Sequence, residues 1–564
     1  MAELVLKGGR VLNVYSSELL RRDVLIKDGK IVSVDADLYG RDSIELIDRV
    51  IVPGYIDCHF HPWFIYNPLE FAKEACTKGI TTLFCDNLMF YMVMDLDLFE
   101  DLMESLSELP IKLFWFVRAV PQTPMEDEEE KFSKENIKRL LSHPLVKSLG
   151  EITRWPKIIE GDENILELIH YANRLGKRVD GHTAGARYNQ IERLSSLGIE
   201  SCHEAINKRE ALERLRAGMY VMMRESSLRR DLKELLRIVT EEEVRTERLM
   251  LTTDCSSPAF YERYGILDYL IKIALDSGID PIATYKMVTL NPSVYFRMEQ
   301  KIGAIAPGRD ADMVILEDLS DPLPQMVISK GEIIAEDGKL CVDFPEINWN
   351  RYLKGLDREI LRYIKRDIFS LEIGDGDINF PVIELISPVI TRCRWMELNI
   401  REGIFDIIAR EDLSHISVLN REGRWISNGL IKGFGRVGGL CSSFNTASQI
   451  LIIGRDIDDM INATIRMLEL GGGIVIADRG KIIYELPLPL GGVMSDRSMR
   501  YLASKDRELC GVLSNFGYSF YDPLYTLVFL PNDFLPEVRI NYKGIVDIKR
   551  DKILWPKTKR VISL

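Results

Sequence analysis

Eight short apolar segments, each followed by a segment of helical periodicity, occupy the region from Val50 to Asp254. The apolar segments read VIVPGYIDCHFH, TTLFC, KLFWFV, VKSLGEI, KRVDGH, GIESCH, MYVMMR and RLMLTTD. Between them, segments such as ILELIHYANRLG and KREALERLRAG place apolar residues three and four positions apart and end on glycine, as amphipathic helices do. Strands that alternate with helices form parallel sheets. Eight such units over about 250 residues predict a TIM-like (β/α)8 barrel.

Polar residues stand at the ends of five of these predicted strands. They are His59 and His61 on the first strand, Glu151 on the fourth, His182 on the fifth, His203 on the sixth and Asp254 on the eighth. Residues two apart on a strand point to the same side, so His59 and His61 can converge on one object. Because barrel active sites lie at the carboxyl ends of the strands, we expect all six side chains at one mouth.

Each of these residues has an ordinary structural explanation when it is taken singly. A strand-ending His or Asp often caps the next helix, and Glu151 can be a solvated loop carboxylate. Taken together, these six side chains would place several ionisable groups at one end of the barrel, which is unfavourable unless a cation is bound there. The combined pattern therefore predicts a metal site.

The ligand set indicates two divalent ions. His59, His61 and Asp254 can hold one ion, His182 and His203 a second, and Glu151 can bridge them through its two oxygens. Two ions about 3.5–4 Å apart share a water molecule and lower its pKa from 15.7 toward about 7. This favours hydrolysis, with Glu151 and Asp254 as the candidate catalytic residues and Asp254 as the proton acceptor. Imidazole and carboxylate ligands without thiolate admit manganese, iron or zinc.

Composition restricts the remaining possibilities. A chain of 564 residues, 46% hydrophobic and 28% charged, is too long for one hydrophobic core, and we expect two or three domains. A net charge of -13 without basic runs argues against a nucleic acid or an anionic membrane as partner. The sequence shows no targeting segment and no apolar stretch of membrane-spanning length, so we expect a cytoplasmic protein. A homo-oligomer is the expected assembly.

The strand-end motifs PGYIDCHFH, SLGEI, DGH, CHEA and TTD resemble, in order and spacing, the metal-binding strands of the amidohydrolase superfamily, and within it the adenine deaminase family. The resemblance continues through LRAGMYVMMRESS and GAIAPGRDADMVILEDL to LELGGGIVIADRGKIIYELPLPLGGVMSD, so it covers most of the chain. It implies hydrolytic deamination of adenine to hypoxanthine and ammonia, a small-molecule substrate, and manganese or iron as the metal.

The resemblance also implies an architecture of three parts. Residues 1–51 and 303–345 would form one small β-sandwich, residues 52–302 the metal-dependent barrel, and residues 371–564 a C-terminal α/β domain that generic amidohydrolases lack. The alternating strands and glycine-containing turns of both flanks agree with the sandwich.

The sequence departs from the family pattern at three places. After His61 the chain reads Pro-Trp-Phe-Ile, where the family typically has Ile-Glu-Ser-Ser. Asp86 is followed by Asn-Leu-Met instead of Pro-His-Glu, and residues 446–449 read Thr-Ala-Ser-Gln instead of His-Asp-Ser-His. We therefore expect a more apolar mouth in front of the same metal centre. Drift at positions that never touch substrate is the alternative explanation.

These departures leave three functional hypotheses. The first is adenine deamination. The second is a related amidohydrolase that acts on a different N-substituted purine or another cyclic C–N substrate. The third is a purine-binding protein without enzymatic activity. The candidate substrate contacts are Trp63, Asp86, Arg224 and Glu225. The last two either contact substrate or close the amino end of a helix.

Overall fold

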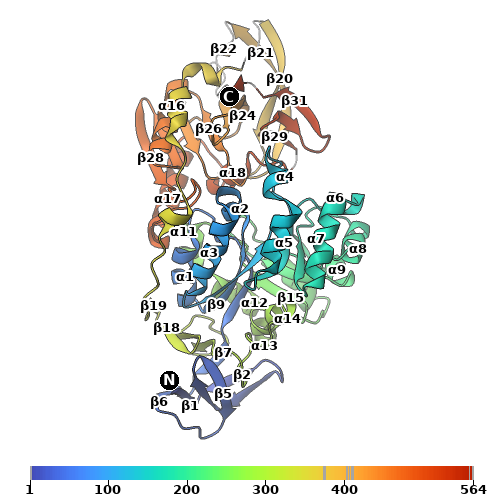
Figure 1. The fold of residues 1–564 in the computed structure, drawn as a ribbon, viewed down its shortest axis with the longest axis vertical. Coiled ribbons are helices and arrows are strands. Elements are labelled where there is room, and N and C mark those ends of the chain that lie inside the picture. Colours follow the sequence, from blue (N-terminus) through green and yellow to red (C-terminus); the bar gives the residue numbers. More distant parts are fainter. Residues whose placement is uncertain are drawn as a thin grey trace.

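A computed structural model describes residues 3–371, 376–401, 404–405, 407, 412–535, 537–557 and 559–561. The chain is elongated, with the N-terminal strands at one end, the barrel in the middle and the C-terminal domain at the other end (Figure 1). No helix within these ranges combines the length and apolar character that crossing a bilayer requires.

The predicted barrel is confirmed. Its parallel strands follow one another in chain order: β8 (Tyr55–Phe60), β9 (Ile80–Asp86), β10 (Lys112–Val117), β11 (Val146–Ile152), β12 (Arg178–Gly181), β13 (Ser201–Cys202), β14 (Tyr220–Arg224) and β15 (Leu249–Thr252). Between β15 and β8 the ring is completed by a bridge from Phe60 to Asp254 and by the His61 amide, which donates to the Asp254 carbonyl at 2.9 Å. This closure places the end of the eighth strand beside the end of the first.

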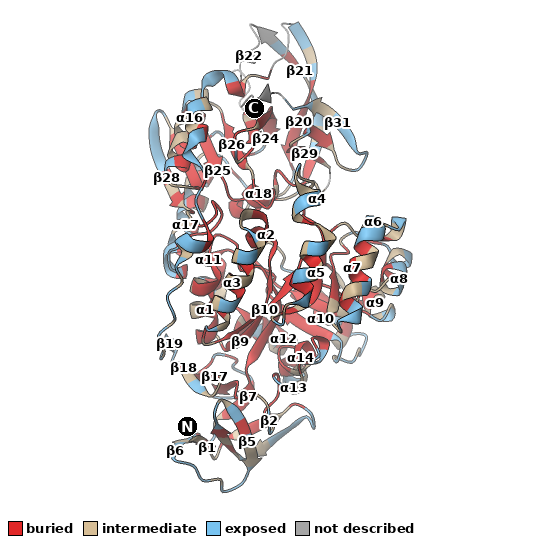
Figure 2. Cartoon of the chain, in the orientation of Figure 1, coloured by how far each residue is buried: buried red, intermediate tan, exposed pale blue. Residues whose placement is uncertain are grey.

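Most of the helices that surround the barrel bury one face and expose the other (Figure 2). The helices are α1 (Pro68–Thr77), α2 (Leu88–Val93), α3 (Leu96–Ser107), α4 (Glu128–Lys131), α5 (Lys134–Ser142), α6 (Trp155–Glu160), α7 (Glu163–Arg174), α8 (Tyr188–Ser196), α9 (Lys208–Arg216), α10 (Leu232–Thr240), α11 (Pro258–Tyr264), α12 (Leu267–Asp276), α13 (Pro281–Lys286) and α14 (Leu290–Tyr295). Of these, α2 is almost wholly buried, whereas α4 has no buried residue. Side-chain caps fix several starts, as where Asn67 accepts from the Leu69 and Glu70 amides before α1.

The first predicted strand is in fact two strands. β7 (Val50–Pro53) pairs with β2 and β16, whereas β8 belongs to the barrel. The chain changes sheets at Gly54, where a Cβ atom would lie 2.2 Å from Thr81 Oγ1. Only glycine fits such a close approach, so this residue permits the change.

Two small sheets lie at the amino-terminal end of the barrel strands (Figure 1). One has the order β5-β4-β1-β6, and the other the order β19-β18-β17-β16-β7-β2-β3. Their strands are β1 (Glu3–Lys7), β2 (Arg10–Asn13), β3 (Glu18–Arg21), β4 (Asp23–Lys27), β5 (Lys30–Asp35), β6 (Asp42–Glu45), β16 (Met313–Leu316), β17 (Met326–Ser329), β18 (Glu332–Glu336) and β19 (Lys339–Leu340). Segments that precede and follow the barrel in sequence thus share one sheet and one apolar core.

The C-terminal domain is built on a large mixed sheet of order β22-β21-β20-β24-β23-β26-β25-β27-β28, with β32 paired to β24, and on a three-stranded sheet β29-β30-β31. Its elements are β20 (Gly376–Leu385), β21 (Thr391–Arg401), β22 (Ile404–Phe405), β23 (Leu413–Leu419), β24 (Trp425–Lys432), β25 (Gly439–Ser442), β26 (Ile450–Gly454), α16 (Ile457–Glu469), β27 (Gly473–Asp478), β28 (Lys481–Pro487), α17 (Met499–Asn515), α18 (Pro523–Phe529), β29 (Val538–Asn541), β30 (Gly544–Asp547), β31 (Lys552–Pro556) and β32 (Lys559–Arg560). The short helix α15 (Trp349–Tyr352) precedes the domain and packs on α3 of the barrel. Two short 3-10 helices, Arg358–Tyr363 and Arg366–Phe369, precede the large sheet. The domain faces the carboxyl ends of the barrel strands (Figure 1).

Candidate metal centre

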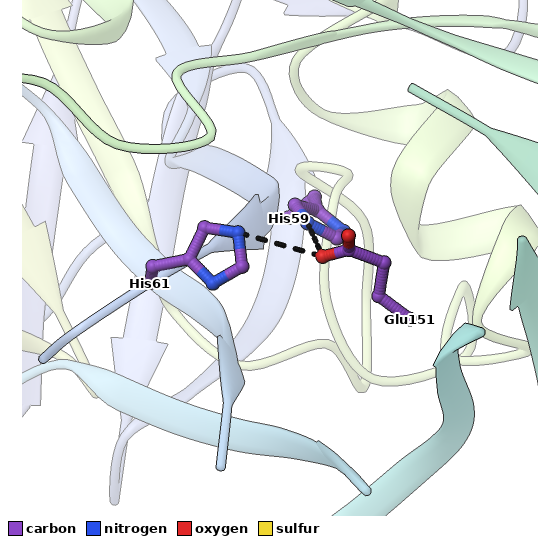
Figure 3. Close-up of side chains that lie close together, drawn as sticks. All are labelled: His59, His61 and Glu151. Atoms are coloured by element: carbon purple, nitrogen blue, oxygen red, sulfur yellow. Dashed lines mark ion pairs between the residues drawn. The ribbon is translucent and has the colours of Figure 1, made fainter. Parts of the chain in front are cut away.

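The carboxylate of Glu151, on β11, lies at the centre of the barrel mouth. His59 and His61, both carried by the end of β8, point toward the same oxygen of this carboxylate (Figure 3). Their Nε2 atoms lie 3.5 Å and 3.6 Å from Glu151 Oε2. Asp254 Oδ1 approaches the same two atoms, at 3.7 Å from His59 and 2.8 Å from His61.

The other oxygen of Glu151 faces a second pair of histidines. His182 Nδ1 lies 2.5 Å and His203 Nε2 lies 3.8 Å from Glu151 Oε1. The two oxygens of one carboxylate therefore face two separate sets of ligand atoms. This is the arrangement that the sequence analysis expects of a bridging ligand between two cations.

The site fits a metal ion by burial and by the state of its donor atoms. His59 and His203 are 1% exposed, and Glu151 is 2% exposed. Within the described part of the chain, the buried atoms His59 Nε2 and His182 Nδ1 make no well-aligned hydrogen bond, although Glu151 oxygens lie 3.5 Å and 2.5 Å away. Buried polar atoms are normally paired, and imidazole nitrogen together with carboxylate oxygen suits divalent transition metals. The side chains of His59, His61 and Glu151, and those of Glu151, His182 and His203, are each close enough to share an ion.

Asp180, on β12, lies against the Nδ1 atoms of two ligand histidines. It was not among the residues predicted from the sequence. Its Oδ2 atom is 3.1 Å from His59 Nδ1 and 3.5 Å from His203 Nδ1. Both rings therefore present Nε2 to the centre. A carboxylate placed against the outer nitrogen of a ligand imidazole fixes the orientation of the ring and raises its basicity. The signal was present, because Asp180 precedes His182 by two residues and lies on the same side of the strand.

Asp86, at the end of β9, gives the same support to His61. Its Oδ2 atom lies 2.8 Å from His61 Nδ1 and accepts from the indole Nε1 of Trp63 at 3.2 Å. Arg118, which follows β10, donates from Nε to Asp86 Oδ1 at 2.9 Å and from Nη2 to Glu151 Oε2 at 2.8 Å. The sequence analysis missed Arg118, although it follows a predicted barrel strand directly.

Two of the predicted substrate contacts, Arg224 and Glu225, face different surroundings. Arg224 Nη1 donates to Asp254 Oδ2 at 2.7 Å and to Glu204 Oε1 at 2.6 Å, so it lies at the metal centre. Glu225 accepts from the Leu232 amide at 3.3 Å and from Arg230 at 3.2 Å, at the start of α10. Trp63, a third candidate, lies with its ring centroid 4.9 Å from that of His61.

The two arginines determine the charge state of the buried carboxylates. Burial raises the pKa of Glu151, but Arg118 and His182 hold it well below its usual range. Burial likewise raises the pKa of Asp254, and Arg224 and His61 outweigh it and lower the pKa. Burial also raises the pKa of Asp86, but Arg118 and His61 lower it to about 2. These carboxylates are thus ionised at neutral pH, and those of Glu151 and Asp254 are available to a cation.

Comparison with known proteins is consistent with this geometry. Residues 50–334 match the model of the amidohydrolase family, and residues 388–552 match that of the adenine deaminase C-terminal domain. A protein of Halalkalibacterium halodurans named "putative adenine deaminase" is 37% identical over 99% of this chain and 95% of its own. An adenine deaminase of Kosmotoga olearia is 32% identical over 97% of this chain and 95% of its own. Among solved structures, a β-aspartyl dipeptidase of Fervidobacterium islandicum covers 62% of this chain and all of its own at 18% identity, with a TM-score of 0.48.

Proposed function

This chain belongs to the adenine deaminase family of the amidohydrolase superfamily, and we propose that it hydrolyses adenine to hypoxanthine and ammonia. The observation that carries the proposal is the convergence of the side chains of His59, His61, Glu151, His182, His203 and Asp254 at the mouth of the barrel, with the two oxygens of Glu151 facing different histidine pairs. A chain that had lost this chemistry would have no evident reason to keep so many buried polar side chains together.

We infer that the site holds two divalent ions. His59, His61 and Asp254 would bind one, His182 and His203 the other, and Glu151 both. Manganese or iron is favoured by the family, and zinc also accepts this ligand set. When bound, such ions supply a water molecule acidic enough to act as a nucleophile at neutral pH.

Side chains of the protein carry out the proton transfers. Asp254 is the candidate general base, because Oδ1 faces the histidines while Oδ2 is held by Arg224. We propose that Asp254 accepts a proton from the attacking water and delivers it to the departing amino group. Arg118 and Arg224 keep the carboxylates of Glu151 and Asp254 ionised. The ligands are buried, and because bulk water is excluded, the interactions between charges at the site are stronger.

Among the predicted substrate contacts, we favour Trp63 and Arg224. Trp63 lies against His61, and Arg224 reaches both Asp254 and Glu204. Asp86 is engaged by His61, Trp63 and Arg118, and Glu225 by the start of α10. Either acid would have to exchange a partner before it could bind substrate directly.

A different N-substituted purine or cyclic C–N substrate is the second candidate. It is favoured by Trp63, which stands where the family pattern has a glutamate. The same metal ligands would serve either substrate, so the choice depends on the walls of the pocket. Two further expectations from the sequence, a cytoplasmic location and a homo-oligomeric assembly, stay predictions.

The test is ammonia release from adenine by purified protein reconstituted with manganese or ferrous iron, run beside a panel of N-substituted purines. His59→Ala is the control that removes a ligand. Release from adenine that depends on His59 supports the proposal. Two bound ions per chain without release from adenine would favour the second candidate, and absence of both metal and turnover would favour a purine-binding protein.

A further inference from the structure

A short loop of the C-terminal domain contacts the metal centre. We call residues 531–535, between α18 and β29, the roof loop. The ring of Phe534 meets the ring of His182 edge-on, at 5.8 Å between centroids and an interplanar angle of 85°. Phe529, at the end of α18, packs against Phe534 with 5.5 Å between ring centroids. A metal ligand of the barrel therefore contacts an aromatic residue more than 300 positions later in the chain.

Buried hydrogen bonds fix the position of the roof loop on the barrel. Thr123, in the loop after β10, donates from Oγ1 to Asn532 Oδ1 at 3.1 Å and accepts from the Asp533 amide at 3.3 Å. Asn532 is fully buried, and its Nδ2 donates to Thr446 Oγ1 within its own domain. Asn532 thus connects the barrel to the C-terminal domain immediately beside Phe534.

Two aromatic rings consequently flank the two halves of the centre. Trp63 lies against His61 from the barrel side, and Phe534 lies against His182 from the C-terminal domain. Aromatic side chains on both halves of the centre suit a flat heterocycle as ligand.

We propose that Phe534 is a specificity-determining residue. It forms an aromatic roof on which the ring of the substrate packs, and the chain of contacts from Thr123 through Asn532 to Thr446 holds it in place. The inference deepens the proposed function, on which it rests for the planar substrate. It also gives Thr446, one of the positions that depart from the family pattern, a positioning role through Asn532.

The experiment measures by calorimetry the binding of adenine and of its product hypoxanthine, which the manganese-loaded protein would not consume, together with the kinetic constants for ammonia release. Phe534→Leu keeps an apolar side chain and removes the ring, so binding should weaken about tenfold to a hundredfold, with the change in KM larger than that in kcat. Phe534→Tyr keeps the ring and should stay within about threefold of wild type. Asn532→Ala should weaken binding in the same direction, and none of the three should alter the metal content.

Phe520→Leu is the matched control, because Phe520 packs on Tyr518 in the same domain. It should bind adenine as the wild type does. Equal binding by wild type and Phe534→Leu would overturn the inference, and so would equal losses in the leucine and tyrosine variants, which would indicate a purely structural role. If adenine binding depends on the Phe534 ring but no ammonia is released, the proposed function is contradicted and the role of Phe534 stands. A wild-type protein that binds no purine would overturn both.

Discussion

Asp180 holds His59 from behind the metal centre, with Oδ2 at 3.1 Å from His59 Nδ1. The same oxygen lies 3.5 Å from His203 Nδ1, so one carboxylate orients a histidine of each ligand set. The pKa of Asp180, which burial raises, is lowered overall by His203 and His59, and the group is ionised at neutral pH. The two halves of the site are therefore coupled through a residue that need not touch either ion.

Asp180→Asn should lower metal affinity about 10- to 100-fold, because a neutral amide orients the two rings less firmly and cannot raise their basicity as a carboxylate does. Competition with a chelator, followed by metal analysis, measures this loss. Ser201→Ala removes only the hydroxyl that donates to Asp180 Oδ1 at 2.6 Å, and its effect should be smaller. Unchanged affinity in Asp180→Asn would show that the histidines are held by packing alone.

The barrel and the ligand set could be predicted from the sequence because both follow from local periodicity. Strand ends are visible in the pattern, and the parallel barrel brings them to one mouth, so His59, Glu151 and Asp254 could be placed together without coordinates. The change of sheet at Gly54 could not be predicted in this way, since it depends on the contact with Thr81.

The supporting residues were harder to predict because their role depends on direction and distance. Arg118 matters through its simultaneous contacts with Asp86 and Glu151, which lie on two other strands. Phe534 reaches His182 from another domain, and no periodic pattern links positions so far apart. Glu225 shows that proximity in the sequence can mislead. It follows Arg224 directly, but its carboxylate accepts from the Leu232 amide at the start of α10, whereas Arg224 contacts Asp254 at the metal centre.

Asp254→Asn should lower kcat about 10²- to 10⁴-fold when it is assayed at saturating metal, because the amide keeps the shape of the side chain but cannot accept the proton of the attacking water. Steady-state ammonia release measures kcat, and metal analysis confirms loading. A variant that keeps more than about a tenth of the wild-type kcat would assign the proton transfer to another group.

Asp86→Ala should lower the free energy of unfolding of the metal-free protein by about 3 kcal/mol, because Arg118 would stay buried after losing its bidentate partner. The expected loss is at the low end for a broken buried ion pair, since Arg118 keeps its contact with Glu151. Urea unfolding gives the value. Asp86→Asn, which retains an acceptor, should lose less, and equal losses in both variants would indicate that charge is unimportant here.

Asp522→Asn should increase the free energy of unfolding at pH 8 relative to the wild type. Burial and the neighbouring Asp506 raise the pKa of Asp522 to about 7, so folding favours its protonated form. This contribution to stability is complete below the usual aspartate pKa of about 4 and is lost as the pH rises through 7. Asparagine stays neutral and can still cap α18, where Asp522 accepts from the Tyr525 amide. The unfolding temperature should therefore rise by about a few degrees at pH 8 and not at pH 4. Asp456→Asn, at the exposed start of α16, is the control, and an equal shift in both variants would refute the argument.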